Sequence, residues 1–234
     1  MPPVRYEQHG PVAVITLDDA ATRNALSPEA LDLVERYALT AGSEPDVRLL
    51  VLTGADGVFC SGAAIREWEA LDESGERLTD SGTGLGDLLA QLPIPVLAAL
   101  PGHAVGGGSE LALAADWRIA DPAAELRFVH LSLALMPGFG GLGRLERLVG
   151  PSTALRLLAT RARVGAEEAE RLGLIEAIVP AAEQLSWAQA LAEQLAGSDR
   201  YALAEIKQAL RDGDERSAFL RVWPHRQLPD RLGS

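Results

Sequence analysis

The sequence predicts an α/β fold built on parallel strands, with helices gathered toward the C-terminus. Residues 47–53 and 94–100 are continuous apolar runs, which are typical of strands covered on both faces. Strand-like and helix-like segments alternate over the first two thirds of the chain, as they do in α/β domains. The last third has a helical pattern, so we expect it to form an appended layer.

Local signals place the elements of the first half. Residues 4–8 and 12–17 flank a turn that contains glycine and are expected to form a hairpin. Ser27 before Pro28 predicts an N-cap and a helix that ends near residue 40. Residues 71–86 are rich in Asp, Glu, Ser, Gly and Thr, and we expect a mobile surface segment that could lie over a site.

The second half is expected to contain shorter strands and most of the helices. We predict strands at residues 116–120, 125–129 and 175–179, and helices at residues 87–92, 142–149, 151–160, 166–172, 186–196 and 201–211. The chain therefore divides into a core of residues 1–180 that carries the active site and a helical C-terminal region of residues 181–234.

Composition limits the class of protein. A formal net charge of −12 disfavours nucleic acid and anionic membranes as partners. The single cysteine, Cys60, excludes an internal disulfide and fits a reducing compartment. The N-terminus lacks the layout of a signal peptide, and no apolar run reaches the length of a transmembrane helix. We expect a soluble, cytoplasmic protein.

The most informative stretch is Gly106-Gly107-Gly108-Ser109-Glu110-Leu111-Ala112, which joins a predicted strand to a predicted helix. Glycines let the backbone turn sharply and let a ligand approach it closely. The first turn of a helix has unpaired N–H groups at the positive end of its dipole, which suits a developing oxyanion. Glu110 lies in that turn and could act on the bound group. The same features also fit an ordinary strand-to-helix turn with a favourable carboxylate.

Four blocks of sequence together resemble the crotonase (enoyl-CoA hydratase/isomerase) superfamily. They are Arg23-Asn24-Ala25-Leu26-Ser27, the segment from Leu52-Thr53-Gly54 to Phe59-Cys60-Ser61-Gly62-Ala63, the glycine stretch above, and Pro137-Gly138-Phe139-Gly140-Gly141. They follow the order and spacing of the family, and the resemblance covers residues 6–210. It implies a crotonase-like spiral of ββα units with a helical C-terminal trimerisation region. It also implies a homotrimer or a dimer of trimers.

The resemblance implies an acyl-CoA substrate whose thioester oxygen binds between the backbone N–H groups of Ala63 and Gly107. Glu110 matches the first of two glutamates with which hydratases of the family activate water, and Gly138 falls in the second catalytic glycine loop. The path of coenzyme A would be lined by Arg23, Ala25, Ala64 and Ile65. Coenzyme A is then part of the substrate, and we expect no covalently bound cofactor and no metal site.

The chain departs from the family where hydratases carry the second glutamate. That position is His130, seven residues before Pro137, and no Asp or Glu lies between Arg127 and Glu146. A histidine can donate and accept protons near neutral pH, so an acid–base role is open. A buried histidine that is hydrogen-bonded in a repurposed site is equally open. Ala64 also departs from the usual Asp or Asn, which affects only the support of a loop.

The C-terminus is a further departure. After Arg211 the chain is shorter than usual, and we expect residues 212–234, with Pro224 and Pro229, to replace the final helix. In relatives this region helps to cover the acyl-CoA, so both coenzyme A binding and assembly depend on how it folds.

These observations predict a lyase of fatty acid metabolism, of the enoyl-CoA hydratase/isomerase type, that works through an oxyanion-stabilised enolate. One alternative is a C–C bond (β-diketone) hydrolase or a decarboxylase of the same fold. Such hydrolases have a histidine at the position of His130, but they also use an Asp in the next loop, where this chain has Phe139. Another alternative is a non-catalytic, acyl-binding accessory subunit.

Overall fold

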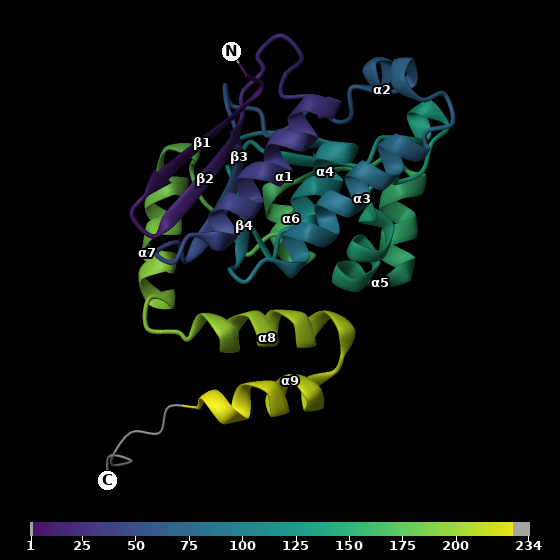
Figure 1. Cartoon of the computed structure of the whole chain (residues 1–234). Helices are drawn as coiled ribbons and strands as arrows, with labels where there is room; N and C mark the ends of the chain where they lie inside the picture. Colours follow the sequence, from purple (N-terminus) through teal and green to yellow (C-terminus); the bar gives the residue numbers. More distant parts are fainter. Residues whose placement is uncertain (1, 227–234) are drawn as a thin grey trace.

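The computed structural model describes residues 2–226 and centres on a six-stranded sheet (Figure 1). The strand order is β1-β2-β3-β4-β6-β9; β1 and β2 are antiparallel, and every later pair is parallel. The strands are β1 Val4–His9, β2 Val12–Leu17, β3 Leu49–Gly54, β4 Val96–Leu100, β6 Trp117–Ala120 and β9 Ala177–Ile178. The predicted α/β class, N-terminal hairpin and parallel strands are therefore confirmed.

A second sheet has three short strands in the order β5-β7-β8. These strands are β5 Ala104–Val105, β7 Glu125–Arg127 and β8 Arg163–Gly165. Isolated bridges join Cys60 to Ala104 and Leu26 to Ala63. The sequence analysis missed β5 and β8, because two or three residues are too few to show an alternating pattern.

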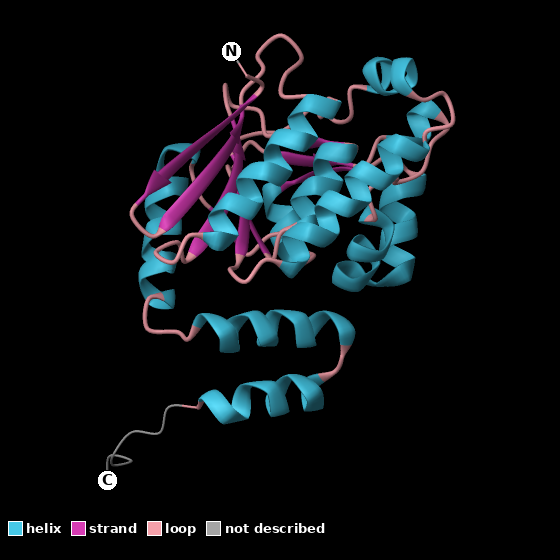
Figure 2. Cartoon of the chain, viewed as in Figure 1, coloured by secondary structure: helices cyan, strands magenta, loops and turns pink. Residues whose placement is uncertain are grey.

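Helices cover both faces of the large sheet (Figure 2). They are α1 Pro28–Ser43, α2 Ile65–Leu71, α3 Glu76–Gln91, α4 Gly107–Ala114, α5 Gly141–Ala159, α6 Ala166–Arg171, α7 Gln184–Leu195, α8 Arg200–Asp212 and α9 Glu215–Val222. Short 3₁₀ helices are η1 His130–Leu133, η2 Ala181–Glu183 and η3 Trp223–His225. Helix α1 begins as predicted, because the Ser27 hydroxyl accepts a hydrogen bond from the Ala30 N–H. Helix α5 kinks at Gly150, which separates the two helices predicted there.

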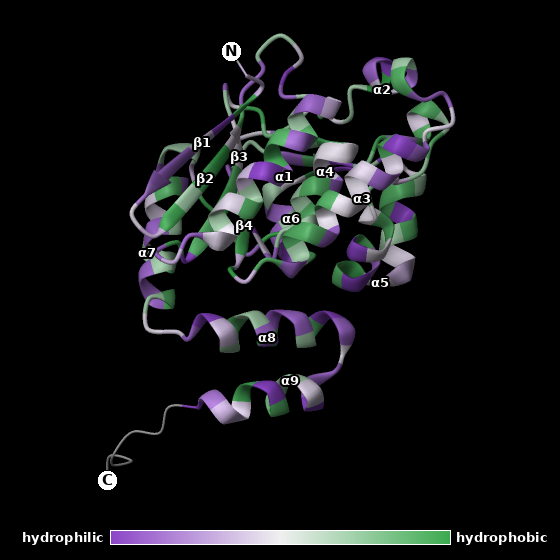
Figure 3. Ribbon diagram, in the orientation of Figure 1, coloured by the Kyte–Doolittle hydropathy of each residue, from purple (hydrophilic) through white to green (hydrophobic). Residues whose placement is uncertain are grey.

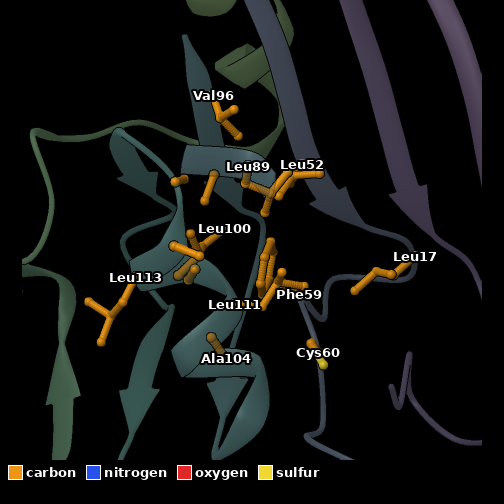
Figure 4. Packing of buried hydrophobic residues seen from close by; sticks show 14 of the residues in the cluster. Leu17, Leu52, Phe59, Cys60, Leu89, Val96, Leu100, Ala104, Leu111 and Leu113 are labelled. Carbon is orange, nitrogen blue, oxygen red and sulfur yellow. The ribbon is translucent and has the colours of Figure 1, made fainter. Parts of the chain in front are cut away.

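The core lies on the two faces of the parallel strands, whose side chains alternate between them. Ile15, Leu50 and Ala98 belong to the large cluster with helices α1, α3 and α4. Their neighbours Val14 and Val51 face the other way and pack in a smaller cluster with α7. Both faces are therefore apolar, which explains the unbroken apolar runs in the sequence and the hydrophobic colour of these strands in Figure 3. Figure 4 shows side chains of the larger cluster around Leu52, Leu89, Leu100, Phe59 and Leu111.

The segment predicted to be a mobile loop, residues 71–86, is mostly helical instead. Helix α3 begins at Glu76, and Leu85 and Leu89 bury their side chains in the core. A Cβ atom added at Gly82 would overlap the ring of Phe139, so the helix approaches that ring closely only because it has glycine there. The prediction was wrong because tertiary packing outweighs the low helix propensity of the Gly and Ser residues in this segment.

The prediction that the final helix is replaced is also wrong. Helix α9 follows α8 after a turn at Gly213, and its first turn is capped by the carboxylate of Asp214, which accepts from the Ser217 N–H. Pro224 does not interrupt α9, because it lies within η3, beyond the last helical residue. Pro229 lies outside the described residues. Within residues 2–226, no helix is long and apolar enough to cross a membrane.

Helix α8 is attached to the core through Lys207, the single lysine of the chain. Its Nζ donates hydrogen bonds to the carbonyl oxygens of Leu89 at 2.9 Å and Ile94 at 3.0 Å, and it pairs with Asp116 Oδ2 at 2.7 Å. Burial lowers the pKa of Lys207, and the charge of Asp116 opposes that shift. Three acceptors around one compact ammonium group explain why a lysine stands here among so many arginines.

We expect Lys207→Met to lower the free energy of unfolding by about 3 kcal/mol or more, because it leaves the Asp116 carboxylate without its buried partner. Urea denaturation measures this change, with Arg36→Met on the exposed side of α1 as the control. A loss below about 0.5 kcal/mol, the range of ordinary surface substitutions, would contradict the role assigned to Lys207.

Candidate active site

The glycine stretch between β5 and α4 forms a sharp turn, as predicted. Gly106 adopts a positive φ of 52°, and helix α4 starts at the next residue. Gly108 packs against Cys60 so closely that an added Cβ would lie 2.8 Å from the Cys60 carbonyl oxygen. Glu110 is in the first turn of α4 and is only 3% exposed. The turn therefore places the Glu110 carboxylate in the interior of the protein.

The two predicted oxyanion donors lie next to each other. A Cβ built on Gly107 would be 3.4 Å from the Ala63 nitrogen. The bridges of Leu26 with Ala63 and of Cys60 with Ala104 bring these segments together. Among the described residues, no acceptor pairs with the N–H of Ala63 or of Gly107. Two free N–H groups at one place form a site that can bind an oxygen carrying negative charge.

The Glu110 carboxylate is hydrogen-bonded on every side. Its Oε1 lies 3.0 Å from Nε2 of His130 and accepts from the Gly138 N–H at 3.2 Å. Its Oε2 accepts from the N–H groups of Phe139 at 2.8 Å and Gly141 at 3.0 Å. A carboxylate has about four acceptor positions, so these four partners occupy all of them. Glu110 thus binds His130 and the second glycine loop at the same time.

His130 begins η1 and is 8% exposed. Because an ionised carboxylate only accepts hydrogen bonds, the network assigns the ring hydrogen to Nε2, which faces Glu110. The other ring nitrogen, Nδ1, is buried and has no hydrogen-bond partner among residues 2–226. Buried polar atoms are rarely left unpaired. The arrangement leaves a histidine nitrogen free to accept a proton.

The second glycine loop, residues 137–141, is held from three directions. Glu110 binds its N–H groups, the Thr83 hydroxyl of α3 donates to the Gly138 carbonyl oxygen at 3.3 Å, and Arg144 of α5 donates to the Phe139 carbonyl oxygen. The Phe139 ring also lies against Gly107, since an added Cβ there would be 3.1 Å from its Cε2. The loop therefore connects the carboxylate with the free N–H of Gly107.

Comparisons with known proteins identify the family of the chain. A sequence model of the Enoyl-CoA hydratase/isomerase family matches residues 7–221. The chain belongs to this family. The short-chain-enoyl-CoA hydratase of Clostridium acetobutylicum is 34% identical over 212 residues, which are 90% of this chain and 81% of that protein. A peroxisomal fatty acid β-oxidation multifunctional protein of Arabidopsis thaliana is 40% identical over 190 residues, which are 80% of this chain and 26% of that protein.

A solved structure supports the same assignment. The crystal structure of an enoyl-CoA hydratase from Bacillus anthracis matches with a TM-score of 0.86 and 30% sequence identity, covering 99% of this chain and 100% of that chain. The match confirms the crotonase-type fold and the membership of the superfamily that the four sequence blocks indicated.

The segments that the family resemblance assigns to coenzyme A are joined by backbone hydrogen bonds. The N–H of Ser61 donates to Arg23 O at 3.1 Å, that of Leu26 to Gly62 O at 2.8 Å, and that of Ala64 to Leu26 O at 3.1 Å. Arg23, Ala25, Ala64 and Ile65 thus come from two paired segments. None of the hydrogen bonds to the Glu110 carboxylate comes from these four residues.

Sequence reasoning missed several residues that shape the site. The N–H groups of Phe139 and Gly141 bind Glu110, yet only the glycine richness of their loop was visible in the sequence. Asn24 supports the Arg23 segment, because its side-chain amide donates to the carbonyl oxygens of Ala55 and Val58. Across residues 2–226, no group of three or more His, Cys, Asp or Glu side chains is arranged to hold a metal ion.

We expect Glu110→Gln to release the second glycine loop. Each carboxylate oxygen of Glu110 is bonded to two donors. A Gln side chain has one acceptor oxygen and an NH₂ group that cannot accept, so the two donors that face the NH₂ group lose their acceptor. Hydrogen exchange of the residue 137–141 amides should then be faster by about tenfold or more. Glu125→Gln on β7, which pairs with Arg127, is the control. Unchanged hydrogen-exchange protection of residues 137–141 would show that Glu110 does not hold this loop.

Proposed function

We propose that this member of the enoyl-CoA hydratase/isomerase family acts on the thioester of an acyl-CoA and hydrates or isomerises a 2-enoyl-CoA. The observation that carries this proposal is the pair of free N–H groups at Ala63 and Gly107, close to the buried pair of Glu110 and His130. Coenzyme A enters as part of the substrate, and the chemistry of the family needs no other cofactor.

In this proposal the thioester oxygen accepts hydrogen bonds from the N–H groups of Ala63 and Gly107. Negative charge gathers on that oxygen when an enolate forms, so these donors stabilise the transition state more than the substrate. One such donor contributes roughly 3–4 kcal/mol in related acyl chemistry. Arg23, Ala25, Ala64 and Ile65 would line the path of coenzyme A, which is supported by the pairing of their two segments.

His130 is the residue that we assign to proton transfer, with Glu110 as its positioning partner. Every acceptor position of Glu110 is occupied, whereas Nδ1 of His130 has no partner among the described residues. Hydration requires a water molecule beside the bound substrate to reach Nδ1, which protein atoms cover in the structure. Nδ1 then takes a proton from that water while the water oxygen bonds to the β-carbon and electrons move to the thioester oxygen. The enolate then takes a proton at the α-carbon from the imidazolium, which restores the neutral ring.

We also propose that the chain assembles as a homotrimer or a dimer of trimers and works in the cytoplasm. Large apolar side chains are exposed directly after His130, at Leu131, Leu133, Leu135 and Met136. Others are exposed on α9 and η3, at Phe219, Leu220 and Trp223. Apolar groups gathered on a surface in this way mark interaction sites. The buried, unpaired Cys60 is compatible with a reducing compartment.

Turnover of 2-enoyl-CoA tests the function. We expect the wild-type protein to hydrate crotonyl-CoA or to isomerise an enoyl-CoA, and His130→Ala to lower kcat/KM by about 10²–10⁴, because the proton-transfer group is lost. The matched control is His9→Ala, at the exposed end of β1. If His130→Ala folds and keeps full activity, His130 is a packing residue. If the wild-type protein turns over no enoyl-CoA, the proposed reaction is wrong.

Light scattering tests the assembly. We expect a mass of three or six times the 24.8 kDa of one chain at micromolar concentration. Phe219→Ser combined with Trp223→Ser should shift the protein toward smaller species, since both substitutions remove exposed apolar surface. A clean wild-type monomer would rule the assembly out.

A further inference from the structure

A cavity of about 400 Å³ lies between α4, α5, β6 and α8, and its lining contains neither Glu110 nor His130. Cavities of roughly 300–1,000 Å³ are of the size that holds small-molecule ligands. We propose that this cavity binds an amphiphilic anion, that is, an alkyl chain ending in a carboxylate or a phosphate. The proposal does not depend on the reaction proposed above.

One wall of the cavity is apolar. Leu203, Ile206 and Leu210 are three and four residues apart and therefore lie on the same face of α8. Leu113 of α4 and Leu148 of α5 add to this wall. Ile206 is 56% exposed and Leu210 is 84% exposed, so the described residues leave much of this wall uncovered. An alkyl chain placed against it would remove apolar surface from water.

The rest of the lining is rich in positive charge. The cavity is lined by five cationic side chains and the single carboxylate of Asp116; the cations are Arg118, Arg144, Arg147, Lys207 and Arg211. The guanidinium of Arg118 already donates to the carbonyl oxygens of Leu174 and Ala115. Asp116 is already neutralised, because it pairs with Lys207 at 2.7 Å and with Arg211 at 3.7 Å. In a chain with a formal net charge of −12, this local excess of cations is unusual.

The carboxylates near these cationic side chains do not balance all of their positive charge. Arg144 pairs with Asp87 at 3.1 Å, whose side chain is largely exposed. Arg147 donates to the Gly143 carbonyl oxygen at 3.3 Å and has no carboxylate partner within residues 2–226. An anion placed between Arg147 and Arg211 would receive charge-assisted hydrogen bonds from both guanidinium groups.

Mutual repulsion supports the same conclusion. Burial lowers the pKa of Arg211, and the neighbouring charge of Arg147 lowers it further, against the effect of Asp116. Burial also lowers the pKa of Arg144, with Arg211 and Arg147 adding to the shift and Asp87 opposing it. A bound anion would relieve this repulsion. The apolar wall and the cationic wall therefore favour the two ends of one amphiphilic molecule.

Isothermal titration of the full chain with decanoate tests the site, with decyl phosphate as a second probe that identifies the preferred head group. We expect saturable binding of at least one of them, and binding at least tenfold weaker in Arg147→Gln and in Arg211→Gln, because each removes one charge-assisted contact. Arg36→Gln removes one positive charge on α1, outside the cavity, and should leave the affinity unchanged.

Two further ligands separate the parts of the proposal. Decanol has the chain without the charge, and sulfate has the charge without the chain, so each should bind at least tenfold more weakly than the amphiphile. Equal binding of decanol or of sulfate would overturn the proposal. So would loss of decanoate binding in saturating coenzyme A, which would locate the ligand at the reacting centre. Absence of decanoate and decyl phosphate binding to the full chain would also overturn the proposal.

Discussion

The buried carboxylate of Glu110 joins helix α4 to η1 and to the second glycine loop, which lie 20 to 31 residues further along the chain. Removing a charge from water is costly unless its hydrogen-bonding positions are filled, and here three backbone N–H groups and one imidazole fill them. The same bonds order the loop of residues 137–141 and orient the ring of His130. One set of contacts therefore both offsets the burial of the charge and fixes the geometry of the proposed site.

Close packing around this carboxylate requires residues without side chains. An added Cβ at Gly82 would overlap the Phe139 ring, one at Gly141 would overlap Glu110 itself, and one at Gly108 would approach Cys60 to 2.7 Å. The Phe139 ring fits between α3 and α4 because both helices present glycine to it. Glycine is therefore required at these positions because close packing leaves no room for a Cβ atom, and not only because its backbone is flexible.

The sequence was sufficient for features that depend on local patterns. The apolar runs identified β3 and β4, and Ser27 with Pro28 identified the start of α1. It failed at α3, where Gly and Ser residues suggested a mobile segment, whereas burial of Leu85 and Leu89 in the core stabilises a helix. The resemblance placed Glu110 and His130 in one site, but the hydrogen bonds that Glu110 accepts from the backbone of the 137–141 loop could not be predicted. These N–H groups lie up to 31 residues further along the chain, and no local pattern indicates that they meet the carboxylate.

The burial of the only lysine has a chemical consequence for a protein of this family. Thioesters acylate neutral amines without the help of an enzyme, and exposed lysines are the usual targets on a protein surface. Here the one lysine side chain is enclosed by two carbonyl oxygens and the carboxylate of Asp116, and the remaining cationic side chains are arginines, which are poor nucleophiles because they stay protonated. The one lysine amino group is therefore held by three acceptors instead of being exposed on the surface.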